Sequence, residues 1–126
     1  MTLPPYADLL GLTVAGTEDG APVLAMPWST GVMGRPGFLH GGAIGGLLEM
    51  AAFSALHARF ADADRPRIKP ITVTVDYMRG GRQVETFAVG RVTRLGKRVA
   101  NLEAIAWQDD RTKPIAVARM NVLLAR

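Results

Sequence analysis

The chain has 126 residues, the size of one domain with one hydrophobic core. Its composition, 48% hydrophobic and 21% charged, is typical of a globular protein and excludes a disordered or low-complexity chain. Because it contains no cysteine, disulfides, thiolate catalysis and cysteine metal sites are excluded, while a net charge of +4 fits either an anionic ligand or a mildly basic surface.

The first 28 residues predict a short helix followed by a β-hairpin. Pro4 and Pro5 suit a first helical turn, and Gly11 suits the position just past the helix end. Two strands, at residues 12–18 and 21–28, flank the turn-forming dipeptide Asp19-Gly20. No basic leader with an apolar core precedes them, so we expect a cytoplasmic location.

Residues 29–37 predict an irregular loop, because Gly31, Gly34, Pro36 and Gly37 interrupt any regular structure. Such a loop, lying next to His40, is a candidate wall of a pocket.

From Gly41 to Phe60 the side chains are apolar on all sides, which predicts a buried helix. The polar exceptions are Glu49, Ser54, His57 and Arg59. A membrane span needs about 20 consecutive apolar residues. Glu49 and the early glycines interrupt the run, so we exclude this interpretation and expect no membrane contact.

The remaining chain predicts four strands, at residues 71–77, 84–94, 99–108 and 115–124. In the first of them apolar residues alternate with polar ones, so we expect one buried face. The third and fourth carry many alanines on one face, which leaves room for a thick apolar element. We therefore predict an α+β fold in which four consecutive, hairpin-linked strands form an antiparallel sheet that curves around the central helix.

Four glycines in the first two turns of this helix need an explanation, since each costs up to about 1 kcal/mol against alanine. They are Gly41, Gly42, Gly45 and Gly46. Close backbone packing is one explanation. For Gly41 and Gly42 the other is that N–H groups at a helix start bind a carbonyl oxygen and stabilise an oxyanion.

Glu49 is an acid within the apolar helix, which favours either a catalytic role or a structural ion pair with Arg59, His57 or a sheet arginine. It lies about 12 Å along the helix from Gly41, at 1.5 Å per residue. The two groups could act on one carbon only if two helices met, so a catalytic Glu49 predicts a dimer.

The two histidines receive different interpretations. His40 either orients the loop or acts as an acid or base, and we favour orientation. His57 is interpreted as structural, because a cation suits the C-terminal end of a helix. No metal-site spacing of ligands is present, so we expect no metal.

The segments HGGAIGGLLEMAA, TVDYMR and LGKRVA together resemble a hotdog-fold thioesterase of the phenylacetate-type branch, and the resemblance covers nearly the whole chain. It implies one hotdog domain over residues 1–126, a long helix within a curved antiparallel sheet, and dimers formed by joining two sheets edge to edge. It further implies pairing of dimers into tetramers, an acyl-CoA substrate and no cofactor.

The resemblance also implies catalytic roles. The Gly41 N–H polarises the thioester carbonyl, Glu49 from the partner subunit acts as general base or nucleophile, and His40 shapes the turn. Many members carry Asn or Gln six residues before the histidine, where this chain has Gly34.

Binding roles follow from the same resemblance. Gly42 lies at the substrate, Tyr77 and Arg79 border the pantetheine or acyl channel, and Lys97 and Arg98 meet the phosphates of coenzyme A.

Two other functions stay open: a non-catalytic acyl-CoA binding module, and a hotdog enoyl-thioester hydratase or dehydratase, which would pair a histidine with the acid. A nucleic-acid partner is not expected, because the basic residues are spread over several turns without a groove-reading element. The identity of the acyl group is left open.

Overall fold

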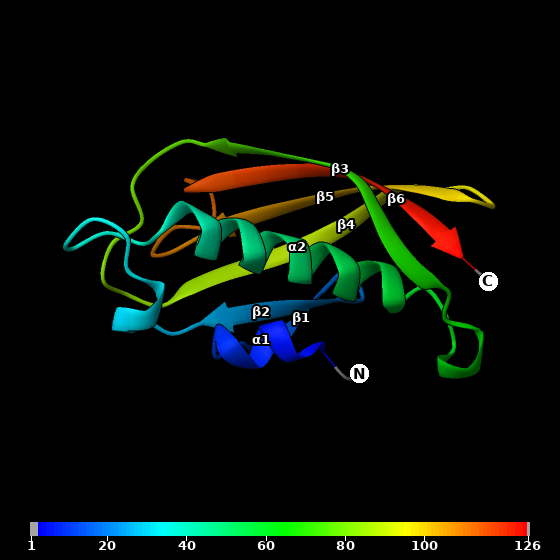
Figure 1. Cartoon of the computed structure of the whole chain (residues 1–126), viewed down its shortest axis with the longest axis horizontal. Coiled ribbons are helices and arrows are strands. Elements are labelled where there is room, and N and C mark those ends of the chain that lie inside the picture. Colours follow the sequence, from blue (N-terminus) through cyan, green and yellow to red (C-terminus); the bar gives the residue numbers. More distant parts are fainter. Residues whose placement is uncertain (1–2, 126) are drawn as a thin grey trace.

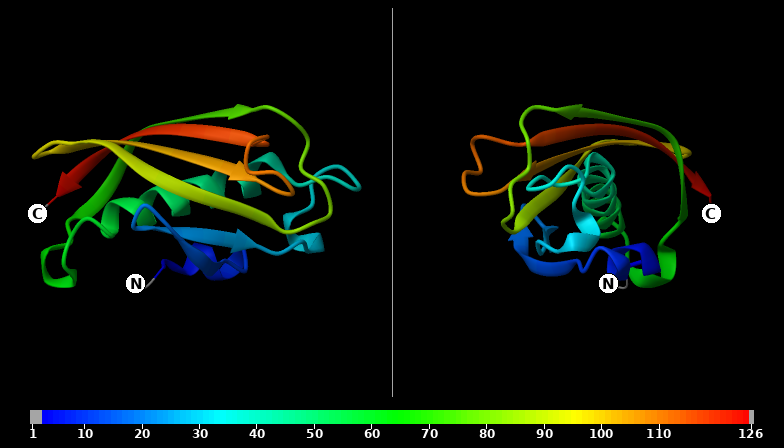
Figure 2. Two further views of the ribbon diagram at one scale, coloured as in Figure 1. Left: turned by 180° about the vertical axis from the view of Figure 1, so that it is seen from behind. Right: turned by 60° about the vertical axis from the view of Figure 1, so that its left-hand side comes forward.

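The computed structural model describes residues 3–125 and shows one long helix lying in the curve of an antiparallel sheet (Figure 1). In chain order the elements are α1 (Pro5–Leu9), β1 (Thr13–Glu18), β2 (Ala21–Met26), the 3-10 turn η1 (Thr30–Val32), α2 (Gly41–His57), the 3-10 turn η2 (Asp62–Asp64), β3 (Arg67–Tyr77), β4 (Thr86–Leu95), β5 (Val99–Trp107) and β6 (Ala116–Ala125). Viewed toward the end of α2, the sheet bends over the helix (Figure 2). The predicted hotdog architecture is confirmed.

The N-terminal elements also agree with the prediction. The turn between β1 and β2 has positive φ at both Asp19 (50°) and Gly20 (81°). This geometry matches the twist of the flanking strands, which is why Asp-Gly is a strong hairpin signal. The hairpin forms one end of the sheet, and α1 ends ahead of Gly11, whose φ is 72°.

The predicted strand order was wrong at one position. The sheet order is β1-β2-β4-β5-β6-β3, so β3 and β4 are not a hairpin, and β3 pairs with β6 from Arg67↔Ala125 to Tyr77↔Ala116. The connection after Tyr77 crosses the ends of the intervening strands. Arg82 is held there by Gln108, whose Oε1 accepts from the Arg82 N–H and whose Nε2 donates to the Arg82 carbonyl, each at 3.0 Å.

The small-residue faces make room for α2 as predicted. On β5 and β6 the alanines that face the helix are almost fully buried, and the pairs Ala104↔Ala118 and Ala106↔Ala116 are direct cross-strand neighbours. On β4, Gly90 lies so close to α2 that a Cβ atom would be 2.5 Å from the Ala51 carbonyl oxygen. The helix therefore packs directly on the backbone of the sheet.

The predicted burial of one face of β3 was wrong for most of its length. The register sets Val73 opposite Met120 and Val75 opposite Ala118, so the alternation is right and these side chains point to the helix side. Yet Val73 is 37% exposed and Tyr77 55%, and Ile71, which has no partner because the register shifts there, is 58% exposed. The reason is that β3 is the edge strand and extends past the width of α2, so the apolar face of β3 is left uncovered.

No helix within the described residues is long and apolar enough to span a bilayer.

Candidate functional site

The site is built around the first turn of α2, which His40 caps. The Nδ1 atom of His40 accepts a hydrogen bond from the Gly42 N–H at 2.8 Å. The His40 carbonyl oxygen accepts from the N–H groups of Ala43 (3.0 Å) and Ile44 (3.2 Å). His40 thus orients the turn through a ring hydrogen bond, the role favoured from the sequence, and its accepting Nδ1 places the ring proton on Nε2.

The Gly41 N–H is left without an acceptor among residues 3–125, although the next three N–H groups of the helix all have one. Free N–H groups at a helix start carry the positive end of the helix dipole. A Cβ atom at this position would meet only Tyr77, at ordinary contact distances of 3.4 to 3.5 Å. The turn therefore presents one donor that has no acceptor among the described residues.

Gly41 lines a cavity of about 430 Å³. The Gly-rich loop supplies one wall through Gly34 and Arg35, as predicted, and the end of β3 and the residues after it supply another through Tyr77 and Arg79. The cavity thus brings together His40, Gly41, Tyr77 and Arg79, four residues that the sequence predicts in one site.

The sequence did not predict two side-chain contacts in this cavity. The guanidinium of Arg35 stacks over the Phe38 ring, 4.5 Å from its centroid. The Tyr77 hydroxyl donates to the Gly41 carbonyl oxygen at 2.7 Å. The available signal for both was weak: a basic residue within the glycine-rich loop, and an aromatic residue at the end of a strand.

Gly34 stands where a side chain cannot be accommodated in this loop conformation. A Cβ atom there would lie 2.9 Å from the Cα of His40, and the Gly34 N–H donates to the Phe38 carbonyl at 2.9 Å. The loop packs backbone to backbone against the residue before the helix. Any group that performs the task of the Asn or Gln seen in many hotdog thioesterases must come from another position.

Close packing within the chain explains two of the four helix glycines. At Gly46 a Cβ atom would be 2.6 Å from the Tyr6 hydroxyl, and at Gly42 it would be 2.9 Å from the His40 Nδ1, so both positions make room for a neighbour. At Gly41 and Gly45 the contacts would be ordinary ones with Tyr77 and Val75. Close packing within the chain therefore does not account for Gly41 or Gly45.

Glu49 is half-buried, and no ion pair or hydrogen bond of its carboxylate is present among the described residues. The predicted ion pair with Arg59, His57 or a sheet arginine is therefore not formed among the described residues. Burial raises the pKa of Glu49 above its usual value, because the apolar surroundings penalise the charged form. A raised carboxyl pKa is common at functional sites, where it helps a carboxylate accept a proton.

His57 differs from the expectation based on the helix dipole. Its pKa is lowered by burial and by the nearby charge of Arg65, so the neutral ring is favoured at the end of α2. Desolvation outweighs the dipole here, because the dipole acts weakly and the ring is partly removed from water.

The match to known families decides the classification. Residues 36–115, more than half of the chain, match the thioesterase superfamily. The chain belongs to the thioesterase superfamily.

Solved structures agree with this classification. A protein of Chromobacterium violaceum is 40% identical, with 97% of this chain and 84% of that one covered and a TM-score of 0.74. A phenylacetic acid degradation-related protein of Ralstonia eutropha (18% identity, 98% and 92% covered, TM-score 0.84) and a Bacillus halodurans protein solved with CoA (20% identity, 98% and 80% covered, TM-score 0.84) share the fold. A search of curated proteins finds no match.

In this member of the thioesterase superfamily, the predicted site residues do not all converge within one chain. Glu49 lies eight residues beyond Gly41 and does not line the cavity at the helix start. Lys97 and Arg98 lie in the turn between β4 and β5, at the opposite end of the sheet from the Gly-rich loop (Figure 1). Gly42 lies in the first turn of α2, next to Gly41, but its N–H already donates a hydrogen bond to His40.

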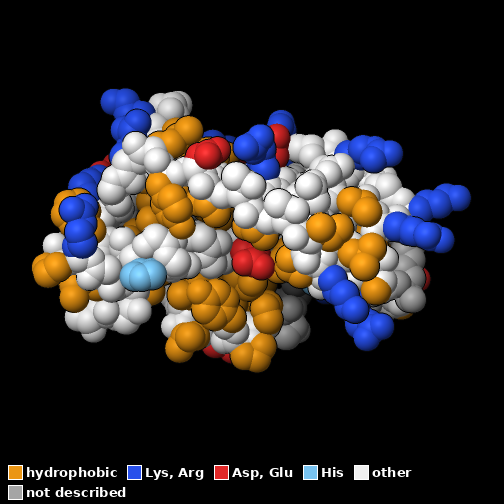
Figure 3. Space-filling view, turned by 45° about the horizontal axis from the view of Figure 1, so that its top comes forward, with side chains coloured by type: hydrophobic (Ala, Val, Ile, Leu, Met, Phe, Trp, Pro, Cys, Tyr) orange, Lys and Arg blue, Asp and Glu red, His pale blue; other side chains and the backbone are white. Residues whose placement is uncertain are grey.

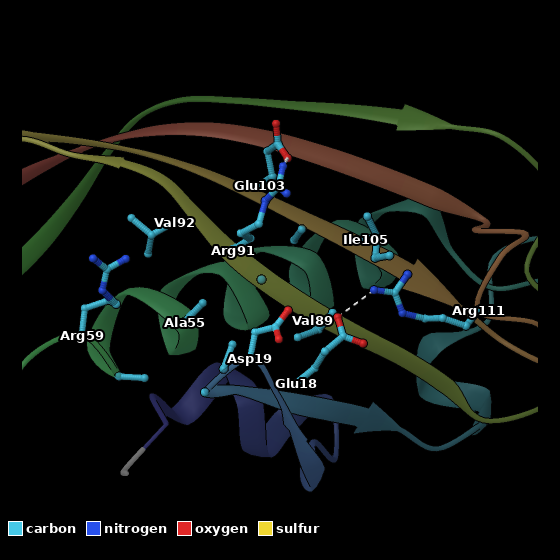
Figure 4. Close-up of a pocket in the computed structure, with 15 residues that line it drawn as sticks. Glu18, Asp19, Ala55, Arg59, Val89, Arg91, Val92, Glu103, Ile105 and Arg111 are labelled. Carbon is cyan, nitrogen blue, oxygen red and sulfur yellow. Dashed lines mark hydrogen bonds and ion pairs between the residues drawn. The ribbon is translucent and has the colours of Figure 1, made fainter.

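A second cavity, of about 510 Å³, opens between the β1–β2 turn, the middle of β4 and β5, and the C-terminal part of α2 (Figure 4). Two ion pairs lie along it, Arg91 with Glu103 and Arg111 with Glu18, each at 2.7 Å. None of the predicted site residues is among those that line it. Its larger volume therefore does not make it the better candidate for the thioesterase chemistry.

No group of three or more His, Cys, Asp or Glu side chains within residues 3–125 is arranged to hold a metal ion.

Proposed function

We propose that the protein is an acyl-CoA thioesterase that hydrolyses a thioester to the free acid and coenzyme A. Membership of the thioesterase superfamily supports thioester hydrolysis in general. The observation that carries the more specific proposal is the N–H of Gly41, which is unpaired among the described residues and belongs to a residue that lines a cavity. Such a donor suits the oxygen of a thioester carbonyl, where negative charge develops during attack.

Glu49 is the proposed general base. Its carboxylate takes a proton from water while the water oxygen bonds to the thioester carbon, and the carbonyl electrons move to the oxygen that the Gly41 N–H stabilises. The intermediate then breaks its carbon–sulfur bond, and the departing thiolate receives the proton from Glu49. Direct attack by Glu49, giving an anhydride that water hydrolyses, is the alternative use of the same residue.

A dimer is part of the proposal, because one chain separates the two groups. Glu49 is about 12 Å along the helix from Gly41, at 1.5 Å per residue. The uncovered apolar face of β3, an edge strand, supports pairing with a second copy. In Figure 3 hydrophobic side chains gather over the middle of the visible face, and Lys and Arg lie mainly toward its two ends.

Basic residues support coenzyme A as the thiol carrier. Arg79, Lys97 and Arg98 are exposed, and none of them forms an ion pair among the described residues. Guanidinium and ammonium groups of this kind suit phosphates. In the proposed dimer, β3 of one chain pairs in antiparallel orientation with β3 of the other. The β4–β5 turn of one chain then approaches the helix start of the other.

The decisive experiment measures thiol release from a panel of short-chain, aromatic and long-chain acyl-CoAs. We expect Glu49→Gln to lower kcat by about 100-fold or more, the usual effect of removing a general base. Glu103→Gln is the matched control, because Glu103 pairs with Arg91 away from the helix start and should leave the rate unchanged. Equal turnover of every panel member by Glu49→Gln and wild type would remove Glu49 from the mechanism.

Gly34 favours one second candidate, an acyl-CoA binding module without efficient chemistry. The position lacks the Asn or Gln of many hotdog thioesterases, and the close approach of His40 leaves no room for a side chain. Calorimetry would identify this function by tight binding of acyl-CoAs that the protein does not hydrolyse.

A further inference from the structure

Tyr77 connects the end of β3 to the first turn of α2. Its hydroxyl donates to the Gly41 carbonyl oxygen at 2.7 Å. Its ring lies against the faces of Gly41 and Gly45, with ring or hydroxyl atoms 3.4 to 3.5 Å from where their Cβ atoms would be. Because Tyr77 is 55% exposed, its contribution to the hydrophobic core is small, and its hydroxyl bond is the most specific contact it makes.

The first turn of α2 needs such a contact. Gly41 and Gly42 have no side chains, and glycine has the greatest backbone freedom of any residue. The ends of helices fray more readily than their middles. An oxyanion donor stabilises charge well only when it is held in place before the reaction. A pair of glycines at a helix start is therefore a poor scaffold for a donor unless neighbouring groups hold it.

Two neighbours hold one peptide group from its two sides. Tyr77 donates to the Gly41 carbonyl oxygen, and the N–H of the same peptide unit, on Gly42, donates to the His40 Nδ1 at 2.8 Å. Hydrogen bonds linked through one amide polarise it and strengthen each other. A carbonyl oxygen has two lone pairs, so the Tyr77 bond is compatible with the normal helical bond from Gly45.

We propose that Tyr77 is a positioning residue: it anchors the Gly41–Gly42 peptide against the His40 cap, and so fixes the conformation of the turn that carries the free N–H of Gly41 beside the cavity. This inference rests on the proposed thioesterase function, in which that N–H receives the oxyanion. Tyr77 acts through Gly41 and need not touch the reacting atoms.

The kinetic test compares Tyr77→Phe with wild type on an acyl-CoA that the wild type hydrolyses. Phenylalanine keeps the ring and removes only the hydroxyl, so we expect kcat to fall about 3- to 10-fold, as for loss of one hydrogen bond. KM should stay within about 2-fold, because the change affects the donor in the transition state more than substrate binding. Tyr6→Phe is the control, since Tyr6 of α1 packs on Gly46 of α2 and its hydroxyl has no hydrogen bond among the described residues. An unchanged kcat in Tyr77→Phe, or a rise in KM alone, would overturn the inference.

A second readout does not depend on activity. In amide NMR spectra, Tyr77→Phe should shift the Gly42 N–H signal upfield and speed its exchange with solvent, because the peptide loses its polarising partner. Tyr6→Phe should leave both unchanged. If the wild type hydrolyses no acyl-CoA, the proposed function fails, and the Gly42 signal alone decides whether Tyr77 holds the turn. An unshifted Gly42 signal in Tyr77→Phe would then reject the anchor.

Discussion

Glu49 illustrates how one residue acquires its properties from its position on a helix. The turns on either side of it are apolar, and among the described residues its carboxylate has neither an ion pair nor a hydrogen bond. Burial alone raises its pKa. The folded chain therefore favours the neutral acid more than the unfolded chain does, and this difference has a measurable effect on stability.

The pH dependence of unfolding should reveal the raised pKa. A carboxyl whose pKa is higher in the folded state stabilises the fold fully below its ordinary pKa of 4.5, and this contribution is lost as the pH rises through the folded value. Glu49→Gln stays neutral at every pH. We therefore expect the variant to be more stable than wild type at neutral pH, with a difference that shrinks toward zero in acid.

Urea unfolding at fixed protein concentration across the acidic and neutral range measures this difference. Glu85→Gln is a suitable control, because Glu85 is an exposed acid that forms no ion pair among the described residues. A constant gap between Glu49→Gln and wild type at all pH values would show that the carboxyl is not destabilised in the folded chain.

The sequence predicted part of the chemistry at this scale. His-Gly-Gly before an apolar run indicates a capped helix with free donors, and the structure has that cap. The environment of Glu49 was harder to predict, because it depends on how the helix is rotated against the sheet. The hydrogen bond from Tyr77 to Gly41 could not be predicted for a related reason. It joins residues 36 positions apart that only the tertiary fold brings together.

At the scale of elements, the contact between α2 and β4 is set by Gly90. A Cβ atom there would lie 2.5 Å from the Ala51 carbonyl oxygen and 2.7 Å from the Ala52 Cα. These are backbone atoms in the middle of a helix, so they cannot rotate out of the way as a side chain would.

Gly90→Ala should therefore destabilise the protein by about 1 to 3 kcal/mol, the usual cost of overpacking a core. Gly45→Ala is the matched control, because its Cβ would meet Tyr77 and Val75 at 3.5 and 4.0 Å, which are ordinary contacts. It should be neutral or stabilising by up to about 1 kcal/mol, since alanine favours helix. Urea midpoints measure both effects, and equal midpoints for the two variants would contradict this account of the helix–sheet contact.

The individual strands were predicted better than the order in which they lie in the sheet. Alternation of apolar and polar residues locates β3, β5 and β6 and identifies the side that faces the helix. Alternation says nothing about which strand lies beside which. Gly80 and Gly81 resemble a hairpin turn in the sequence, but Arg82 is held by Gln108, and the chain continues across the sheet instead of reversing.

At the scale of the whole molecule, the proposed site residues fall into separate groups within one chain. The free N–H and the basic residue Arg79 lie at one end, while Glu49 lies along the helix and Lys97 and Arg98 lie at the other end. In the proposed dimer, the exposed apolar edge strand β3 is the contact through which a second copy brings these groups together.

Sedimentation of charged edge variants tests this arrangement. Ile71 is 58% exposed on β3, and a lysine there should block edge pairing, so we expect Ile71→Lys to convert a dimer into monomers and to abolish thioester hydrolysis. Val14→Lys places the same charge on β1, the opposite edge, where Val14 is 57% exposed, and should leave the dimer intact. Loss of the dimer in Val14→Lys but not in Ile71→Lys would place the interface at β1 and contradict pairing through β3.

The position of β3 at the edge of the sheet also has a consequence for the order in which the protein is made. Residues 67–77 find their neighbour in residues 116–125, so β3 leaves the ribosome long before the strand with which it pairs. Contacts between distant parts of a chain form slowly, because the intervening segment must first be closed into a loop. The apolar helix and the unpaired strand after it are therefore synthesised before the strands that shelter them, and the nascent chain must stay soluble until the last strand is added.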